Sequence, residues 1–316
     1  VPLALLDARW RGDGRCSGIP YARRVPPLAR TRAWPTMEVS GQLFVWNDPQ
    51  GTKPTADVAI PEIPIHGDAG WTDWVWNHVD VEGSHCREIV DNVVDMAHFF
   101  YVHYGMPTYF VNVFEGHTAT QMMRSLPRAD AVGVSQNTNY SDENQSHATY
   151  FGPSYMIDKL WSAGRTGADE PNIYLINCHY PITQTSFRLQ YGVMVEKPAG
   201  MGDEQAEQIA QAVAKGIAIG FEQDVAIWKN KTRIDNPLLS EEDGPVYQLR
   251  RWYEQFYVDV EDVTPEMVNR FEFEIDTERA LQSWQAEVDE NIAAGRSAFA
   301  ANLTSSTPAA AASSVG

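Results

Sequence analysis

Apolar residues recur at helical spacing in two stretches of the chain. In residues 203–229 they return every three or four positions, which predicts the longest helix, with Asp203 as its N-terminal cap. Residues 85–104 show the same rhythm and predict a second helix. Because Gly105 and then Met106-Pro107 follow, we expect this second helix to end near that point.

Runs of β-branched and aromatic residues fill the middle of the chain. Four of these runs predict strands, over residues 109–121, 150–157, 173–180 and 187–195. Residues 127–147 contain few large apolar side chains and predict a surface loop. Four strand candidates in succession favour an antiparallel sheet over helix-linked parallel strands. The expected fold class is therefore α+β, an antiparallel β-sheet with a long C-terminal helix.

Composition divides the chain into one main domain and two smaller segments. Residues 1–55 are rich in Arg, Gly and Pro, and their one strand candidate, residues 41–48, is too little to build a core. Residues 56–294 carry the periodic elements and form the main domain. Residues 295–316 are rich in Ala and Ser, and we expect a disordered tail there.

Charge, hydropathy and cysteine content restrict the possible partners and the cellular compartment. A net charge of -18 over 316 residues argues against nucleic acid or an anionic membrane as the main partner. No apolar run reaches the length of about 18 residues that a membrane span needs, so we expect no membrane span. The three cysteines are isolated, which favours a reducing compartment and a cytoplasmic location.

The most informative segment runs from Asp95 to His103. It places two imidazoles and a carboxylate within nine residues, separated by aromatic and apolar side chains. On a helix, Asp95 and His98 lie ~60° apart, whereas His98 and His103 lie ~140° apart. Both histidines can therefore reach one ion only if the helix ends or distorts between them. The zinc-protease pattern does not fit, because no Glu adjoins the first His. The alternative to a metal site is that both histidines are ordinary core residues whose hydrogen bonds are made within the protein.

Asp224 interrupts the apolar stripe of the long predicted helix. An unpaired buried carboxylate is costly, so this side chain needs a cation, an arginine or a metal. Arg250 or Arg251 could pair with it. With two histidines lacking a third ligand, metal ligation becomes the leading interpretation. Two imidazoles and one carboxylate form the facial triad of non-haem Fe(II) oxygenases, although zinc with the same ligands would indicate a hydrolase. Aromatic surroundings favour an apolar organic substrate.

Longer motifs extend this interpretation to a known family. Asn92-Val93-Val94-Asp95-Met96-Ala97-His98, with His103, resembles the iron site of Rieske-type non-haem iron oxygenases. The likeness is greatest to the oxygenase component of 3-ketosteroid 9α-hydroxylase, and it runs from about Asp7 to about Ala293. It is carried by Trp71-Thr72-Asp73-Trp74, Asn112-Val113-Phe114-Glu115-Gly116-His117, Tyr150-Phe151-Gly152-Pro153-Ser154 and Arg250-Arg251-Trp252-Tyr253-Glu254-Gln255-Phe256.

The resemblance implies roles for individual residues. It implies His98, His103 and Asp224 as ligands of one Fe(II). It implies Asp95 as a carboxylate linking the iron histidine to a cluster in the neighbouring subunit, and Asn92 beside the iron. The residues expected to face the steroid are Val93, Gln121, Tyr150, Met156, Asn177, Phe221 and Trp228. Asp158 stands where relatives are expected to have an amide, so the resemblance does not fix the preferred ring substrate.

The resemblance also implies an architecture and partners. The main domain would be a helix-grip, START-like catalytic domain, and residues 1–55 a partial Rieske-type β remnant. The protein would be a monooxygenase of steroid metabolism and cholesterol catabolism, assembled as a homotrimer. It would hydroxylate the 9α carbon of a 3-ketosteroid with O2. Electrons would come from NADH through a separate reductase of the ferredoxin or flavin type.

One part of the family pattern differs in this sequence. A Rieske [2Fe-2S] cluster needs two Cys and two His, which the family supplies as Cys-x-His and Cys-x-x-His ahead of the position of Asp7. Leu3-Ala4-Leu5-Leu6 stands in place of the second pair. The expectation is therefore a truncated cluster region and impaired electron supply. The alternative function is a catalytically inactive sterol- or lipid-binding module of the same fold.

Overall fold

The computed structural model describes residues 8–54, 59–131, 142–162, 171–240 and 242–298. The chain divides into two units, Val1–His66 and Gly67–Gly316. In the first unit the described strands form two antiparallel pairs: β1 (Arg9–Trp10) with β2 (Cys16–Gly18), and β3 (Thr36–Val39) with β4 (Gln42–Val45). The strand predicted within residues 41–48 is confirmed as β4.

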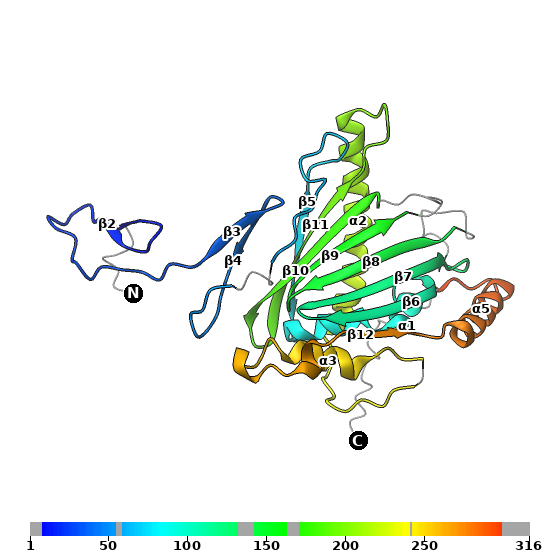
Figure 1. The fold of residues 1–316 in the computed structure, drawn as a ribbon. Coiled ribbons are helices and arrows are strands. Elements are labelled where there is room, and N and C mark those ends of the chain that lie inside the picture. The colour runs from blue at the N-terminus through cyan, green and yellow to red at the C-terminus, as the bar shows by residue number, and fades with distance from the viewer. Residues whose placement is uncertain (1–7, 55–58, 132–141, 163–170, 241, 299–316) are drawn as a thin grey trace, which may run out of the picture. The chain divides into compact units, whose positions relative to one another are not determined.

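An eight-stranded antiparallel sheet dominates the second unit (Figure 1). Its strands lie in the order β12-β6-β7-β8-β9-β10-β11-β5. Their bounds are β5 Val75–Glu82, β6 Gly105–Glu115, β7 Thr118–Pro127, β8 Asn144–Phe151, β9 Tyr155–Trp161, β10 Ile173–Thr183, β11 Ser186–Val195 and β12 Phe271–Glu274. The mixed helix and sheet architecture, with one large antiparallel sheet, is confirmed.

Two of the predicted strands are wrong because each spans a hairpin turn. Residues 109–121 include the end of β6 and the start of β7, which meet at Gly116 with φ of 56°. Residues 150–157 likewise cross from β8 to β9 through Gly152, with φ of 80°. The turns span only residues 116–117 and 152–154, so each fell inside a predicted strand, although Gly116 and Gly152-Pro153-Ser154 are turn signals in the sequence.

The sequence analysis also misplaced the end of one loop and missed two strands. The loop predicted over residues 127–147 is wrong at its end, since β8 begins at Asn144; residues 132–141 of that loop lie outside the described residues. The outer strands β5 and β12 were not predicted. Both contain exposed acidic residues, which lowers the share of β-branched and aromatic side chains in these strands.

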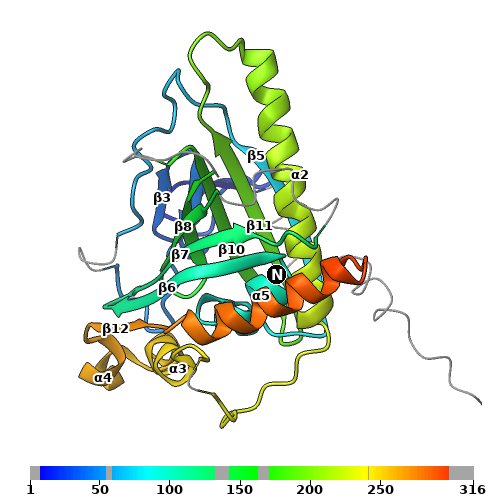
Figure 2. The same ribbon diagram turned by 90° about the vertical axis from the view of Figure 1, so that its right-hand side faces the viewer.

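Helix α2 (Asp203–Trp228) lies along the sheet beside β5 and β11 (Figure 2). Ala206, Ala210 and Ala214 are buried and leave room for close packing. The predicted helix is confirmed, but its predicted cap is wrong. The N-cap is Gly202, without a side-chain hydrogen bond, and the Asp203 carboxylate instead pairs with Lys197 Nζ at 2.9 Å.

The long helix α2 is not the last element of the chain. It is followed by α3 (Val246–Glu254), η3 (Val260–Asp262), α4 (Pro265–Val268), β12 and α5 (Glu278–Ala293). Residues 299–316, which make up most of the predicted tail, lie outside the described residues. The helix predicted over residues 85–104 is two helices, η2 (Cys86–Val93) and α1 (Met96–Tyr101).

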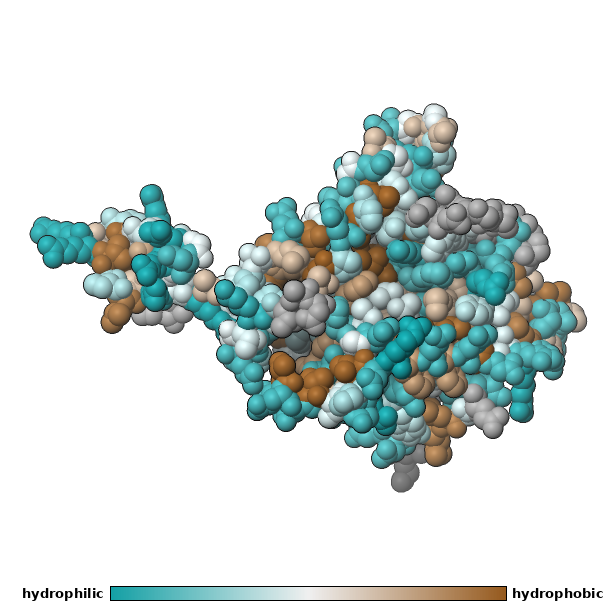
Figure 3. Space-filling model, in the orientation of Figure 1, coloured by the Kyte–Doolittle hydropathy of each residue, from teal (hydrophilic) through white to brown (hydrophobic). Residues whose placement is uncertain are grey.

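Polar side chains cover most of the visible surface, as the excess of acidic residues suggests (Figure 3). Within the described part of the chain, no helix is both apolar enough and long enough to cross a bilayer.

The segment after α2 is anchored to η2 by a partly buried charge network. Asp91 Oδ2 accepts from Lys231 Nζ at 2.8 Å and from Arg250 Nη2 at 2.9 Å. Burial alone would raise the pKa of Asp91, but these hydrogen bonds and positive charges hold its pKa below the ordinary value. The helix that leads into α1 is therefore tied to residues that lie beyond α2.

Gly244 allows the same segment to approach the backbone of η2. A Cβ atom at this position would lie 1.9 Å from the carbonyl oxygen of Val94. Because that oxygen is part of the backbone, no side-chain rotation can relieve the clash.

We expect Gly244→Ala to lower the free energy of unfolding by about 1–3 kcal/mol through overpacking. Gly216→Ala is the matched control, since Gly216 lies in α2 and a methyl group added there would have no atom within 4 Å. That control should stabilise the protein by roughly 0.5–1 kcal/mol. Urea denaturation of both variants measures the difference, and equal stability would contradict the packing argument.

Candidate metal centre

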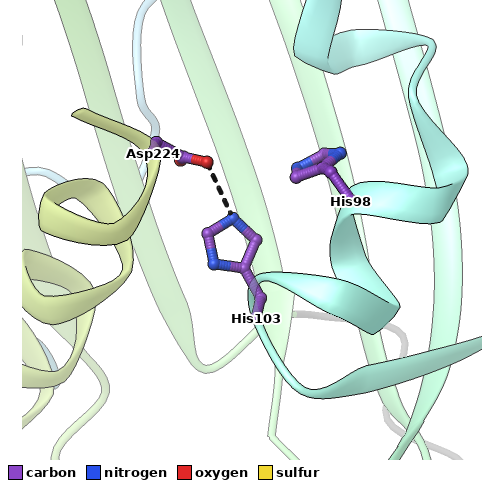
Figure 4. A group of neighbouring side chains, drawn as sticks. All are labelled: His98, His103 and Asp224. Atoms are coloured by element: carbon purple, nitrogen blue, oxygen red, sulfur yellow. Dashed lines mark ion pairs between the residues drawn. The ribbon is translucent and has the colours of Figure 1, made fainter. Parts of the chain in front are cut away.

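His98, His103 and Asp224 converge from two helical regions that are distant in sequence. Their potential ligand atoms all lie within 4.8 Å of one another. His103 Nε2 is 3.3 Å from Asp224 Oδ1, and the imidazole planes of His98 and His103 meet at 80°. Figure 4 shows His103 directed at Asp224, with His98 facing the same space. The structure therefore brings together all three predicted ligands.

The end of α1 explains how two histidines five residues apart meet. The helix ends at Tyr101, and the backbone N–H groups of Val102 and His103 both donate to His98 O, at 2.7 and 3.4 Å. Tyr104 then takes φ of 57°, in the left-handed region. The predicted break between the histidines is confirmed.

Asp95 has a different place from the one that helix geometry predicted. It precedes α1 as the N-cap, and its Oδ1 accepts from His98 N–H at 3.1 Å. Its backbone oxygen contacts His98 Nδ1. Asp95 therefore fixes both the helix start and the ring orientation of His98, while its own side chain stays exposed.

Each candidate ligand has a polar partner outside the centre. The contact with Asp95 O occupies His98 Nδ1, and Gln223 Oε1 lies 3.3 Å from His103 Nδ1. With that oxygen accepting the Nδ1 proton, Nε2 of His103 is left free to face Asp224. Such outer partners set the tautomer and the orientation of metal-binding histidines.

Asn92 performs the equivalent task for the carboxylate. Its Nδ2 donates to Asp224 Oδ1 at 3.3 Å, and its Oδ1 accepts from Trp228 Nε1 at 3.4 Å. The arginine alternative for Asp224 is wrong: Arg250 pairs with Asp91, and Arg251 is exposed and forms no ion pair with Asp224 in the described structure. Within the described residues, the ion-pair partner of Asp224 is His103.

Burial and charge act differently on the two imidazoles. Burial is the largest influence on His98 and, with the neighbouring His103, holds its pKa below the ordinary value despite Asp95 and Asp224. Burial also disfavours the proton on His103. The hydrogen bond and charge of Asp224, supported by Gln223, outweigh that effect and raise the pKa of His103. The centre thus contains one neutral imidazole and one paired with a carboxylate.

The donor set fits a mononuclear divalent metal. Ligand atoms ~2.1 Å from one ion lie roughly 3 Å apart when they subtend a right angle, close to the 3.3 Å between His103 and Asp224. Two imidazoles and a carboxylate leave other coordination positions open. Among the described residues, no other group of three or more His, Cys, Asp or Glu side chains could hold a metal.

A [2Fe-2S] cluster does not fit the residues of this structure. Cys16, Cys86 and Cys178 all lie within its described ranges and all are free thiols. None of the three joins a metal-binding group there.

A cavity of about 150 Å³ adjoins the candidate centre. All seven residues predicted to face a substrate line it, together with Asn92 and the three ligands. Asp158, which the resemblance marked as bearing on substrate preference, also lines it, and five lining residues were not predicted: Ile89, Phe99, Ser146, Ala148 and Leu175. On β8 and β9 the lining positions alternate, so strand periodicity would have found Ser146 and Ala148 once the turn at Gly152 was located.

The chain resembles known proteins along most of its length. Residues 45–257 match the family model described as 3-Ketosteroid 9alpha-hydroxylase C-terminal domain. A probable 3-ketosteroid-9-alpha-monooxygenase oxygenase component of Rhodococcus rhodochrous is 81% identical over 98% of this chain and 77% of its own length. The 3-ketosteroid-9-alpha-monooxygenase oxygenase component of Mycobacterium tuberculosis is 57% identical over 90% of this chain and 73% of its own.

Solved structures show a similar fold at low sequence identity. Dicamba monooxygenase bound to dicamba aligns with a TM-score of 0.54 and 18% identity, over 79% of this chain and 77% of that one. The NdmA QL mutant of Pseudomonas putida CBB5 with caffeine aligns with a TM-score of 0.57 and 12% identity, over 86% of this chain and 76% of that one.

We expect Gln223→Leu to weaken Co(II) binding by about 10- to 100-fold, because His103 loses the partner that orients its ring. Gln223→Glu keeps an accepting oxygen and should bind within a few-fold of wild type. Gln211→Leu is the matched control, on the same helix but exposed and bonded to Glu207. Chelator competition measures the affinities. Wild-type affinity in Gln223→Leu would show that this contact does not orient His103.

Proposed function

This chain belongs to the family of 3-ketosteroid-9-alpha-monooxygenase oxygenase components, and we propose that it hydroxylates a 3-ketosteroid at its 9α carbon at a mononuclear non-haem Fe(II). As a member of this family the protein is an oxidoreductase. One observation carries the proposal: His98, His103 and Asp224 meet at the wall of a largely apolar cavity.

The proposed reaction balances with an external source of two electrons. A ring C–H bond breaks and a C–OH bond forms, so that RH + O2 + 2 e⁻ + 2 H⁺ gives ROH + H2O. We propose that NADH supplies the electrons through a separate reductase of the ferredoxin or flavin type. Iron held by the triad would supply the redox activation of O2 that side chains cannot perform alone.

The residues of the chain would hold the reactants in place. His98, His103 and Asp224 would bind the iron on one side and leave the other side open. Asn92 keeps the Asp224 carboxylate in place through its amide. Catalysis of this kind depends on such fixed geometry, because a small displacement of a reacting group is costly.

The cavity walls supply most of the binding energy for a steroid. Val93, Phe221 and Trp228 present apolar surface beside the metal centre, and apolar burial contributes ~25 cal/mol per Å². Polar orientation would come from Gln121, Tyr150 and Asn177. Burial raises the pKa of Tyr150 well above its ordinary value, so its hydroxyl remains a hydrogen-bond donor. Asn177 Oδ1 is buried, has no hydrogen-bond partner among the residues that the structure describes, and can accept a hydrogen bond.

We further propose that Asp95 faces the neighbouring subunit of a homotrimer. The proposal is supported by the exposure of its side chain and by the cavity of about 340 Å³ at this surface, which Asp95 and Asn92 both line. We propose that residues 56–294 form a helix-grip, START-like domain, which is supported by the position of α2 along the sheet. We also propose a cytoplasmic location, which the three free thiols support.

We expect the purified protein to bind one Fe(II) per chain and, with hydrogen peroxide, to convert androst-4-ene-3,17-dione to a monohydroxylated product. Peroxide supplies the oxygen atom and both electrons, since RH + H2O2 gives ROH + H2O, so this assay needs no reductase. The double variant His98→Ala with His103→Ala should lose both iron and product. His117→Ala is the matched control, at the turn between β6 and β7. Iron analysis and mass spectrometry are the measurements.

The outcomes separate the proposed enzyme from the sterol-binding alternative. Steroid binding with iron fully loaded and no product would favour a binding module. Iron retained by the double variant would refute the assigned ligands.

A further inference from the structure

Asp158 is an acidic side chain in the cavity wall that belongs to no ion pair among the described residues. It lies on β9 and is 8% exposed. Its described hydrogen bond comes from Ser146 Oγ, which donates to Oδ1 at 2.8 Å. Because Oδ1 is occupied in this way, Oδ2 is the oxygen left for a ligand in the cavity.

The surroundings of Asp158 favour its neutral form. Within the described residues, no lysine, arginine or histidine forms a salt bridge with it. Burial raises the pKa of Asp158 to about 7, and the hydrogen bond from Ser146 only partly opposes that rise. A carboxyl group kept neutral by an apolar site can donate a hydrogen bond to a substrate oxygen, whereas a carboxylate can only accept.

Few other titratable groups face this cavity. Tyr150, on β8, and the triad of His98, His103 and Asp224 complete the set on its wall. The neighbouring strand β10 contributes Leu175 and Asn177, which do not titrate. The charged neighbours His147 and Lys159 alternate with Ser146 and Asp158 along their strands and therefore point to the other face of the sheet.

We propose that Asp158, held by Ser146, is a specificity-determining residue whose neutral carboxyl group donates a hydrogen bond to the 3-ketone oxygen of the substrate. This inference rests on the proposed steroid function and adds the chemical group that is recognised. A ketone only accepts hydrogen bonds, so a donor in the wall selects it over an analogue without that oxygen. When Asp158 ionises, the donor is lost and a negative charge faces the ketone.

The test is equilibrium dialysis of the Fe(II)-loaded protein without oxygen, using androst-4-ene-3,17-dione and its 3-deoxo analogue androst-4-en-17-one. Neither steroid titrates between pH 6 and pH 8. For wild type, affinity for the dione should fall roughly tenfold from pH 6 to pH 8, because the binding-competent neutral form is lost above the pKa of Asp158. Affinity for the 3-deoxo analogue should change much less.

Three variants identify the source of this pH dependence. Asp158→Asn keeps a donor that does not titrate, so the dione should bind equally at both pH values; any slope that survives belongs to the other groups on the wall. Ser146→Ala removes the hydrogen bond that favours the carboxylate, so the midpoint of the affinity loss should move to higher pH. Asp158→Leu should lose the roughly tenfold preference for the dione over its 3-deoxo analogue.

The results distinguish failure of this inference from failure of the proposed function. If wild type binds neither steroid, the steroid function fails. If wild type binds the dione but Asp158→Leu keeps its preference, or Asp158→Asn keeps the wild-type pH profile, the assignment of Asp158 is overturned while the steroid function stands. Thermal melting of each variant confirms that it is folded, and the wild-type pH profile needs no substitution.

Discussion

The end of helix α1 is the constraint on which the candidate centre depends. Five residues separate His98 from His103, and on a continuous helix their side chains would diverge by ~140°. The helix instead ends at Tyr101, and the positive φ of Tyr104 turns the chain into β6. His103 can therefore face Asp224 while His98 points into the same space. A longer α1 would separate the two imidazoles.

Around this turn, the chain orients each ligand with a different kind of group. A backbone carbonyl holds His98, a side-chain amide holds His103, and a second amide, itself fixed by an indole, holds Asp224. These contacts come from η2, the start of α1 and the end of α2. The charge network of Asp91 with Lys231 and Arg250 keeps these same regions together. The geometry of the centre therefore depends on the same packing that holds the domain together.

Much of this centre could be predicted from sequence, because residue chemistry and helix geometry are local. The spacing of His98 and His103 required a break, and the Gly and Pro that follow supplied one. The partner of Asp224 could not be predicted in the same way. Arg250 and Arg251 were the alternatives to a metal until the structure placed Arg250 on Asp91, and that placement depends on tertiary packing. The hairpin turns at Gly116 and Gly152 were missed because each is only two or three residues long and is flanked on both sides by β-branched and aromatic residues. On β8 and β9 the sequence predicted Tyr150 and Met156 as lining residues, but not their strand neighbours Ser146 and Ala148.

The separation of the ligands along the chain has a thermodynamic consequence. His98 and His103 adjoin β6, whereas Asp224 sits near the end of α2, so an unfolded chain cannot present the three groups together. An ion bound there would stabilise only the folded state, by RT ln(1 + [L]/Kd), or about 2.7 kcal/mol at one hundred times Kd. Occupancy would then act as a cross-link between the end of α1 and the longest helix, α2.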